Sequence, residues 1–145
     1  MTWQPTEADL QLAAPHVAYE IRTLRLAWEH HGSNLFAYTS WYTHCRNLMD
    51  FFDGRGKDKD LFARHYIDGT AWDDSLKRLC RPDGYDEYRD AVSRQAAHLT
   101  FYRVELQTKG FLPNEEITKH LLGLALQFVQ MLAPPRATWF ADLLL

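Results

Sequence analysis

The stretch that decides the fold of this chain runs from Asn34 to Phe52 and reads NLFAYTSWYTHCRNLMDFF. Its apolar side chains recur at helical spacing on two separate stripes. One stripe comprises Leu35, Tyr38, Tyr42, Cys45, Met49 and Phe52, and the other comprises Ala37, Trp41, His44, Leu48 and Phe51. The polar remainder is a narrow strip of Thr43, Arg46, Asn47 and Asp50. A helix with two apolar faces is covered on both sides, so this stretch predicts the central helix of a helical core.

Helical spacing also dominates the chain on both sides of this stretch. A helix is expected from Thr6 to Gly32, with a break or restart at Pro15, because proline fits best in a first turn. The remaining helices are predicted at 61–66, 75–81, 85 to at least 99, and 114 to about 133. The apolar tail Ala137–Leu145 is expected to cap the core or a neighbouring subunit. Strand-like alternation is absent, so the fold class is all-α, and the economical arrangement is an antiparallel four-helix bundle with additional short helices.

Length and composition predict one globular domain over residues 1–145. The 145 residues are 46% hydrophobic and 24% charged, which excludes collagen, low-complexity disorder and a disulfide-dense miniprotein. The longest run free of charge and proline, Leu121–Ala133, has 13 residues, whereas a membrane-spanning helix needs about 20. The chain shows no basic and then apolar leader, and Cys45 and Cys80 do not form a disulfide framework. A cytoplasmic protein is therefore expected.

Charge and motif content exclude several classes of function. A formal net charge of −3 argues against a dedicated duplex-DNA binder. The Gly-Arg-Gly-Lys segment at 54–57 lacks the spacing of a phosphate-binding loop, and no Gly-x-Ser-x-Gly motif is present. Two i,i+4 pairs join an imidazole and a carboxylate: His16 with Glu20, and Glu116 with His120. Such a pair is half of a bundle metal site, but surface pairs are the commoner use of this spacing, so no metal or cofactor is expected.

The most suggestive chemical feature is Arg94 with His98, again at i,i+4 spacing. The polar strip of the central helix, with Arg46, Asn47 and Asp50, could face this pair. Cleavage of RNA by its own 2′-hydroxyl needs a base for the hydroxyl proton and a cation for the phosphorane charge, and His and Arg suit these roles. The alternative is a structural network in which a buried histidine bonds Asp50 or Asn47.

Two elements of the chain resemble a known family. His44-Cys-Arg46-Asn-Leu-Met-Asp50-Phe-Phe52 and, some 45 residues later, Ala97-His98-Leu-Thr-Phe-Tyr-Arg103 are similar to a His-x-Arg-x-Leu-x-Asp-Phe-Phe helix and an Ala-His-Leu-Thr-x-x-Arg element. Both occur in small bacterial helical proteins of the HEPN superfamily. The resemblance covers roughly residues 34–106 and implies a four-helix bundle that commonly dimerises.

Many HEPN domains are metal-independent ribonucleases of toxin–antitoxin and phage-defence systems, with four to six residues between a catalytic Arg and His. Arg94 and His98 have three residues between them, which departs from that pattern.

Two hypotheses of function follow. The first is an RNA-cleaving toxin or phage-defence component, with His98 as general base or acid, Arg94 or Arg46 as phosphate ligand, and Asp50 as the orienting residue. Its partners would be a second copy of the chain, an RNA substrate and an antitoxin. The second is a non-catalytic dimeric helical module that binds a protein partner, in which the same polar residues are structural. The first hypothesis requires that His98 meets Arg46.

Overall fold

The computed structural model describes residues 3–97 and 114–143, and every regular element in these ranges is helical. The α-helices are α1 (Glu7–His30), α2 (Leu35–Asp53), α3 (Ala63–Tyr66), α4 (Ala71–Arg78), α5 (Tyr85–Ala97) and α7 (Asn114–Met131). A 3₁₀ helix, η1 (Arg136–Leu143), follows α7. The predicted all-α class is confirmed. None of the helices in the described ranges is long and apolar enough to cross a membrane.

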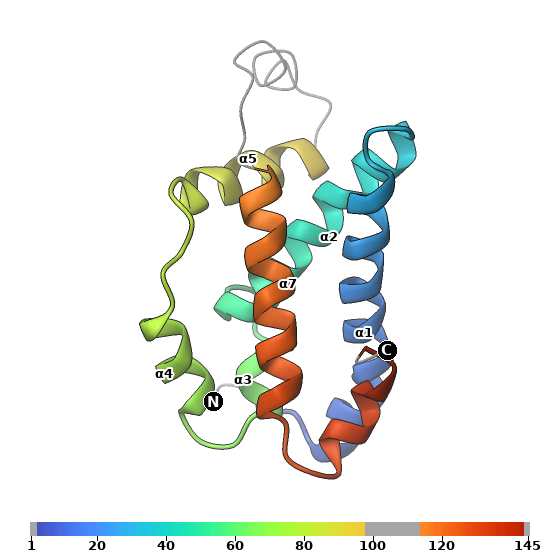
Figure 1. Cartoon of the computed structure of the whole chain (residues 1–145). Coiled ribbons are helices and arrows are strands. Elements are labelled where there is room, and N and C mark those ends of the chain that lie inside the picture. The colour runs from blue at the N-terminus through green and yellow to red at the C-terminus, as the bar shows by residue number, and fades with distance from the viewer. Residues whose placement is uncertain (1–2, 98–113, 144–145) are drawn as a thin grey trace.

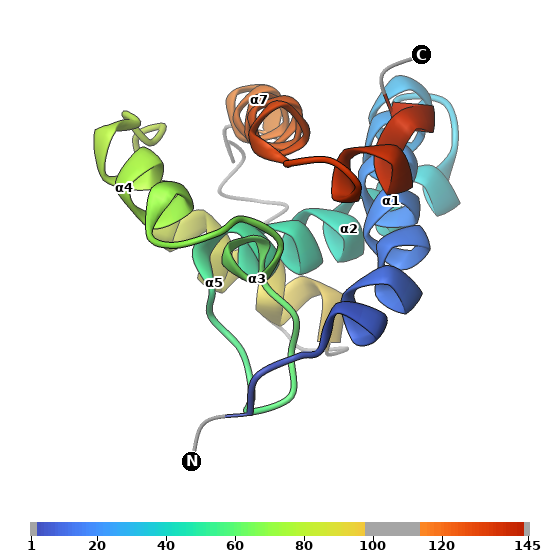
Figure 2. The ribbon, with the colours of Figure 1, turned by 90° about the horizontal axis from the view of Figure 1, so that it is seen from below.

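The helix α2 occupies the centre of the molecule, as its two apolar stripes predict. It packs against α1, α5, α7 and α3. The long helices α1 and α7 lie along the molecule, while α5 lies across one end of it (Figure 1). Seen from below, α2 lies between α1 and α5, with α7 on one side only (Figure 2). The other side of α2 faces outward, so one face of this central helix is left for polar residues.

Local chemistry explains where the first two helices begin and end. Thr6 forms a capping box with Asp9, in which Thr6 Oγ1 accepts from the Asp9 amide at 3.2 Å and Asp9 Oδ2 accepts from the Thr6 amide at 2.8 Å. Asn34 caps α2 by accepting from the Phe36 amide at 2.8 Å. Gly54 ends α2 with a φ of 68°, a left-handed conformation that favours glycine.

The break predicted at Pro15 is wrong, because α1 continues through it. Proline removes one helical hydrogen bond, to the carbonyl of Gln11. Both Pro15 and Gln11 lie on the exposed side of α1, where water can bond that carbonyl. The helix predicted at 75–81 also begins earlier, at Ala71, and ends earlier, at Arg78. The Thr70 hydroxyl donates to Asp74 at 2.8 Å in its first turn, which favours the earlier start.

An aromatic cluster around Phe128 forms the centre of the core. The ring of Phe128 meets five other rings within 6.3 Å: Phe51, Phe52, Tyr66, Trp72 and Phe140. All five contacts are edge-on, the geometry that aromatic pairs prefer. Phe140 is fully buried, so the apolar tail caps the core of its own chain, one of the two places expected for it. These contacts join α2, α3, α4, α7 and η1.

Candidate functional site

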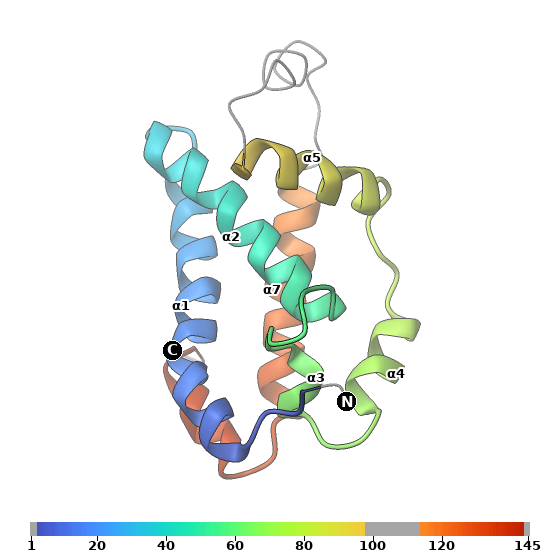
Figure 3. The same cartoon turned by 180° about the vertical axis from the view of Figure 1, so that it is seen from behind.

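The polar strip predicted on the central helix lies on the outward face of α2. Thr43 and Asn47 are exposed, and Arg46 and Asp50 are half-buried. Viewed from behind, α2 passes in front of α7 (Figure 3). We call Thr43, Arg46, Asn47 and Asp50 the α2 polar strip. Its position agrees with the sequence pattern. The helices α1 and α5 lie on either side of it.

On the α5 flank, Asp50 is bound by Arg89. The Nη2 and Nε atoms of Arg89 donate to Asp50 Oδ1 at 2.5 Å and 3.2 Å. Burial by itself would lower the pKa of Arg89, but the hydrogen bond and the charge of Asp50 outweigh it and raise that pKa. The carboxylate proposed to orient a histidine is therefore neutralised by an arginine that the sequence reading did not assign to the site.

The structure describes the other three predicted site residues to different extents. His98 lies outside the described residues. Arg94 belongs to α5, with its side chain outside the described part of the chain. Arg46 is half-buried on α2, with no hydrogen bond or ion pair to another described residue. The structure thus brings Asp50 together with Arg89, while the meeting of His98 with Arg46 stays a prediction.

On the α1 flank, a second charged pair borders the strip. His44 Nδ1 lies 2.6 Å from Glu20 Oε2, and the Asn47 amide donates to the same oxygen at 3.2 Å. His44 is 8% exposed, and the ring of Tyr19 meets it edge-on at 5.6 Å. Glu20 thus pairs with His44 of the neighbouring helix.

A small hollow lies beside this pair. His16, Glu20 and Asn47 contribute polar groups to its lining, and Val17 and Phe51 contribute apolar ones. Its volume is about 240 Å³, which is below the roughly 300–1,000 Å³ of small-molecule sites. The hollow beside the Glu20–His44 pair is therefore smaller than a typical small-molecule site.

A third charged side chain, Asp53, lies where α2, α5 and α7 meet. The carboxylate of Asp53 is only 2% exposed and accepts from Arg81 Nη2 at 2.9 Å and from the Tyr85 hydroxyl at 3.2 Å. Burial raises the pKa of Asp53, and the charge of Arg81 opposes that shift. His120 packs edge-on against Tyr85 at 5.4 Å, and burial lowers its pKa, with Arg81 acting in the same direction. The two hydrogen bonds to Asp53 link α2 to Arg81 and to α5, and the ring contact of His120 with Tyr85 links α5 to α7.

No group of three or more His, Cys, Asp or Glu side chains in the described ranges is placed to hold a metal ion. One member of each i,i+4 pair has another contact in the structure. Glu20 of the His16–Glu20 pair is hydrogen-bonded to His44, and His120 of the Glu116–His120 pair packs against Tyr85.

The sequence reading missed Arg89, Glu20 and His44 as members of the charged pairs. Their signal is weak, since His44 is counted within an apolar stripe of the central helix, and Glu20 and Arg89 each lie next to a buried apolar residue of their helix. A charge in such a position predicts a partly buried pair, but the spacing within one helix does not name the partner across the interface.

A separate surface feature is a row of apolar side chains on α1. Leu12, Tyr19 and Leu26 recur at seven-residue intervals and are 77%, 54% and 55% exposed. At about 100° per residue, their backbone positions lie on the side of α1 opposite the buried Val17. The Tyr19 ring remains 54% exposed while it also contacts His44 of α2. We call these three residues the outer α1 stripe. Large apolar side chains in a row on the outside of a helix are typical of an interaction surface.

Comparisons of the chain with protein-family models, with curated proteins and with solved structures gave no match.

Proposed function

We propose that the protein is a non-catalytic helical module that forms a homodimer through the outer α1 stripe. The observation that carries this proposal is the exposure of Leu12, Tyr19 and Leu26 on one face of the longest helix. The α2 polar strip and its flanks then have a structural role, which is to hold α1, α2 and α5 in register.

The spacing of the stripe favours a second copy of the chain as the partner. Leu12 and Leu26 lie seven residues on either side of Tyr19. If two α1 helices pack antiparallel about a two-fold axis at Tyr19, each Leu12 meets the Leu26 of the other copy. An interface with two-fold symmetry requires such a self-complementary patch. A protein partner of different sequence would not need this symmetry.

The chemistry of the polar residues also favours a structural role. The carboxylates Glu20, Asp50 and Asp53 each accept hydrogen bonds from a basic side chain of another segment. Each bond crosses between elements, so it fixes how the helices pack. A catalytic acid or base needs access to a substrate, whereas Asp53 is closed off and the hollow near Glu20 is small.

The oligomeric state tests this proposal. We expect light scattering of the wild type, coupled to size-exclusion chromatography, to give a mass twice the 17.0 kDa of one chain. Leu26→Glu should give monomers, since it puts a charge against Leu12 of the other copy at each end of the apolar contact. Leu126→Glu is a matched control, because Leu126 on α7 is 53% exposed and lies outside the stripe. A monomeric wild type, or a dimer that survives Leu26→Glu, contradicts the proposal.

A second candidate is a HEPN-like four-helix bundle that cleaves RNA in a toxin or phage-defence system. The resemblance of 44–52 and 97–103 supports it, together with Arg46, which forms no ion pair with another described residue. His98 would act as base or acid, and Arg94 or Arg46 would bind the phosphate. Asp50 would orient the histidine.

Labelled structured RNA, incubated with the protein in a chelator, distinguishes the two candidates. Cleavage by the wild type, lost in folded His98→Ala and Arg46→Ala variants, would establish the nuclease and remove the non-catalytic assignment. Inert wild type would remove the nuclease candidate. The dimer assay remains informative in either case, because it measures mass and does not depend on activity.

A further inference from the structure

A groove of about 720 Å³ lies between α4 and α7. Its size falls within the roughly 300–1,000 Å³ of small-molecule sites. The lining residues are Asp68, Thr70, Ala71, Asp74, Ser75, Arg78, Leu79, Gln127 and Met131. The groove is far from the outer α1 stripe, since α4 and α1 lie on opposite sides of the molecule (Figure 1). It is therefore independent of the proposed dimer interface.

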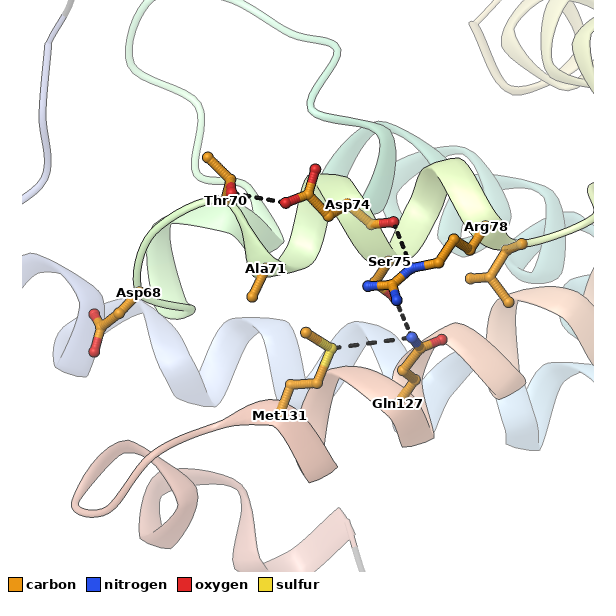
Figure 4. A pocket seen from close by; sticks show the side chains of 9 residues that line it. Asp68, Thr70, Ala71, Asp74, Ser75, Arg78, Gln127 and Met131 are labelled. Atoms are coloured by element: carbon orange, nitrogen blue, oxygen red, sulfur yellow. Dashed lines mark hydrogen bonds between the residues drawn. The ribbon is translucent and has the colours of Figure 1, made fainter.

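Hydrogen-bond donors gather at one end of this groove. The Arg78 guanidinium lies over the pair formed by Ser75 and Gln127 (Figure 4). Arg78 Nε is anchored to the backbone carbonyl of Asp74 at 3.1 Å, which holds the guanidinium in place and leaves its two Nη groups for a ligand. The Gln127 amide donates to Ser75 Oγ, so the Ser75 hydroxyl keeps its own proton to donate.

The charges of the lining determine which ligand suits these donors. Asp74 forms an ion pair with Lys77 at 3.1 Å and accepts from the Thr70 hydroxyl, and Asp68 shares Arg136 with Glu7. Arg78 has no ion pair with another described residue. Arg78 is thus the charged side chain of this lining whose partner is left open, and its guanidinium is the group that an anionic ligand would bind.

Two further features narrow the class of anion. Arg78 is the single cation of the lining, and two carboxylates lie along the same groove, so a singly charged anion is favoured over a phosphate dianion. Arginine binds a carboxylate through two parallel hydrogen bonds. Met131, Leu79 and Ala71 supply apolar surface beside the donors.

We propose that the α4–α7 groove binds a small monocarboxylate with a short apolar chain. The carboxylate accepts hydrogen bonds from the Nη groups of Arg78 and from the Ser75 hydroxyl. The apolar chain lies against Met131 and Leu79. Binding involves no covalent step, so the site acts as a receptor for the ligand and leaves it unchanged.

A titration followed by two-dimensional NMR tests this site, with hexanoate as the probe. The side-chain amide signal of Gln127 is expected to shift in the millimolar range, and neutral 1-hexanol should bind about tenfold more weakly. Arg78→Gln should weaken hexanoate binding by about tenfold, because the charge is lost while one donor group remains. Arg78 is exposed, so this variant should keep its circular-dichroism spectrum.

Lys119→Gln is the matched control, since it removes one positive charge from an exposed position of α7 two turns before Gln127. Its affinity for hexanoate should stay close to that of the wild type. The proposal is overturned if hexanoate and 1-hexanol bind equally, if Arg78→Gln binds as the wild type does, or if hexanoate moves no signal of the groove. Tighter binding of inorganic phosphate than of hexanoate would overturn the carboxylate assignment.

Discussion

Arg89 of α5 donates two hydrogen bonds to one carboxylate oxygen of Asp50 on α2, at 2.5 Å and 3.2 Å. The two side chains are 21% and 31% exposed, so water screens the pair only in part. This contact joins two helices that are separated by the whole segment 54–84. It also uses the carboxylate that a nuclease reading would assign to orienting a histidine.

Loss of one partner of this pair should destabilise the fold. Arg89→Gln is expected to lower the free energy of unfolding by about 1 kcal/mol, because Asp50 is left half-buried without its cation. Urea denaturation measures this change. Lys119→Gln, which breaks the exposed pair with Glu115, should leave the midpoint unchanged. Equal effects of both substitutions would show that the Asp50–Arg89 pair behaves as a surface pair.

Asp53 should make the free energy of unfolding depend on pH. Because burial raises its folded pKa above the ordinary value of 3.8, its contribution is fully present below that value and is lost as the pH rises through the folded pKa. Asp53→Asn removes this dependence. The stability of the wild type relative to the variant should therefore fall as the pH rises above 3.8.

Tyr85→Phe gives an internal check on this pH dependence. The Tyr85 hydroxyl stabilises the ionised Asp53 and so lowers its pKa. Without that hydroxyl, the loss of stability should move to higher pH in urea denaturation at a series of pH values. A shift toward lower pH would contradict the assigned role of the hydroxyl.

His120 should produce a loss of stability in acid. Burial and Arg81 lower its folded pKa from 6.5. A histidine of this kind contributes stability above its unfolded pKa, and the contribution is lost as the pH falls through the folded pKa. His120→Gln should flatten the profile of unfolding free energy below pH 6.5. If the variant keeps the acid loss of the wild type, another group is responsible.

Phe140 should be essential for the docking of η1. Its ring is fully buried against Tyr66 and Phe128, so Phe140→Ala is expected to cost about 3–5 kcal/mol of unfolding free energy. Phe36→Ala removes the same ring from a position that is 84% exposed and should change stability by less than about 0.5 kcal/mol. Thermal denaturation of the two variants compares them directly.

Most helices could be predicted from the sequence, because their signals are local. The expected helix at 34–52 corresponds closely to α2, Leu35–Asp53, since Asn34 caps its start and apolar spacing extends through it. Pro15 was misjudged because the cost of proline depends on whether water reaches the freed carbonyl. Exposure of that carbonyl is a property of the folded molecule.

Less of the candidate site could be predicted. The sequence places Arg46, Asn47 and Asp50 on one polar strip, and the structure places that strip on the outward face of α2. Arg89 as the partner of Asp50, and His44 as the partner of Glu20, could not be predicted, because each pair joins two helices. The groove between α4 and α7 was also missed, since its lining comes from two segments about fifty residues apart.

The sequence by itself determined that this protein is helical, that α2 is central, and that α2 keeps one polar face. These properties follow from the 3.6-residue period of the helix, which any short window of the chain records. Only the tertiary structure decided which charges meet and where a ligand-sized groove forms. Such pairings depend on the angles and offsets at which helices pack, and these are set by the whole core at once.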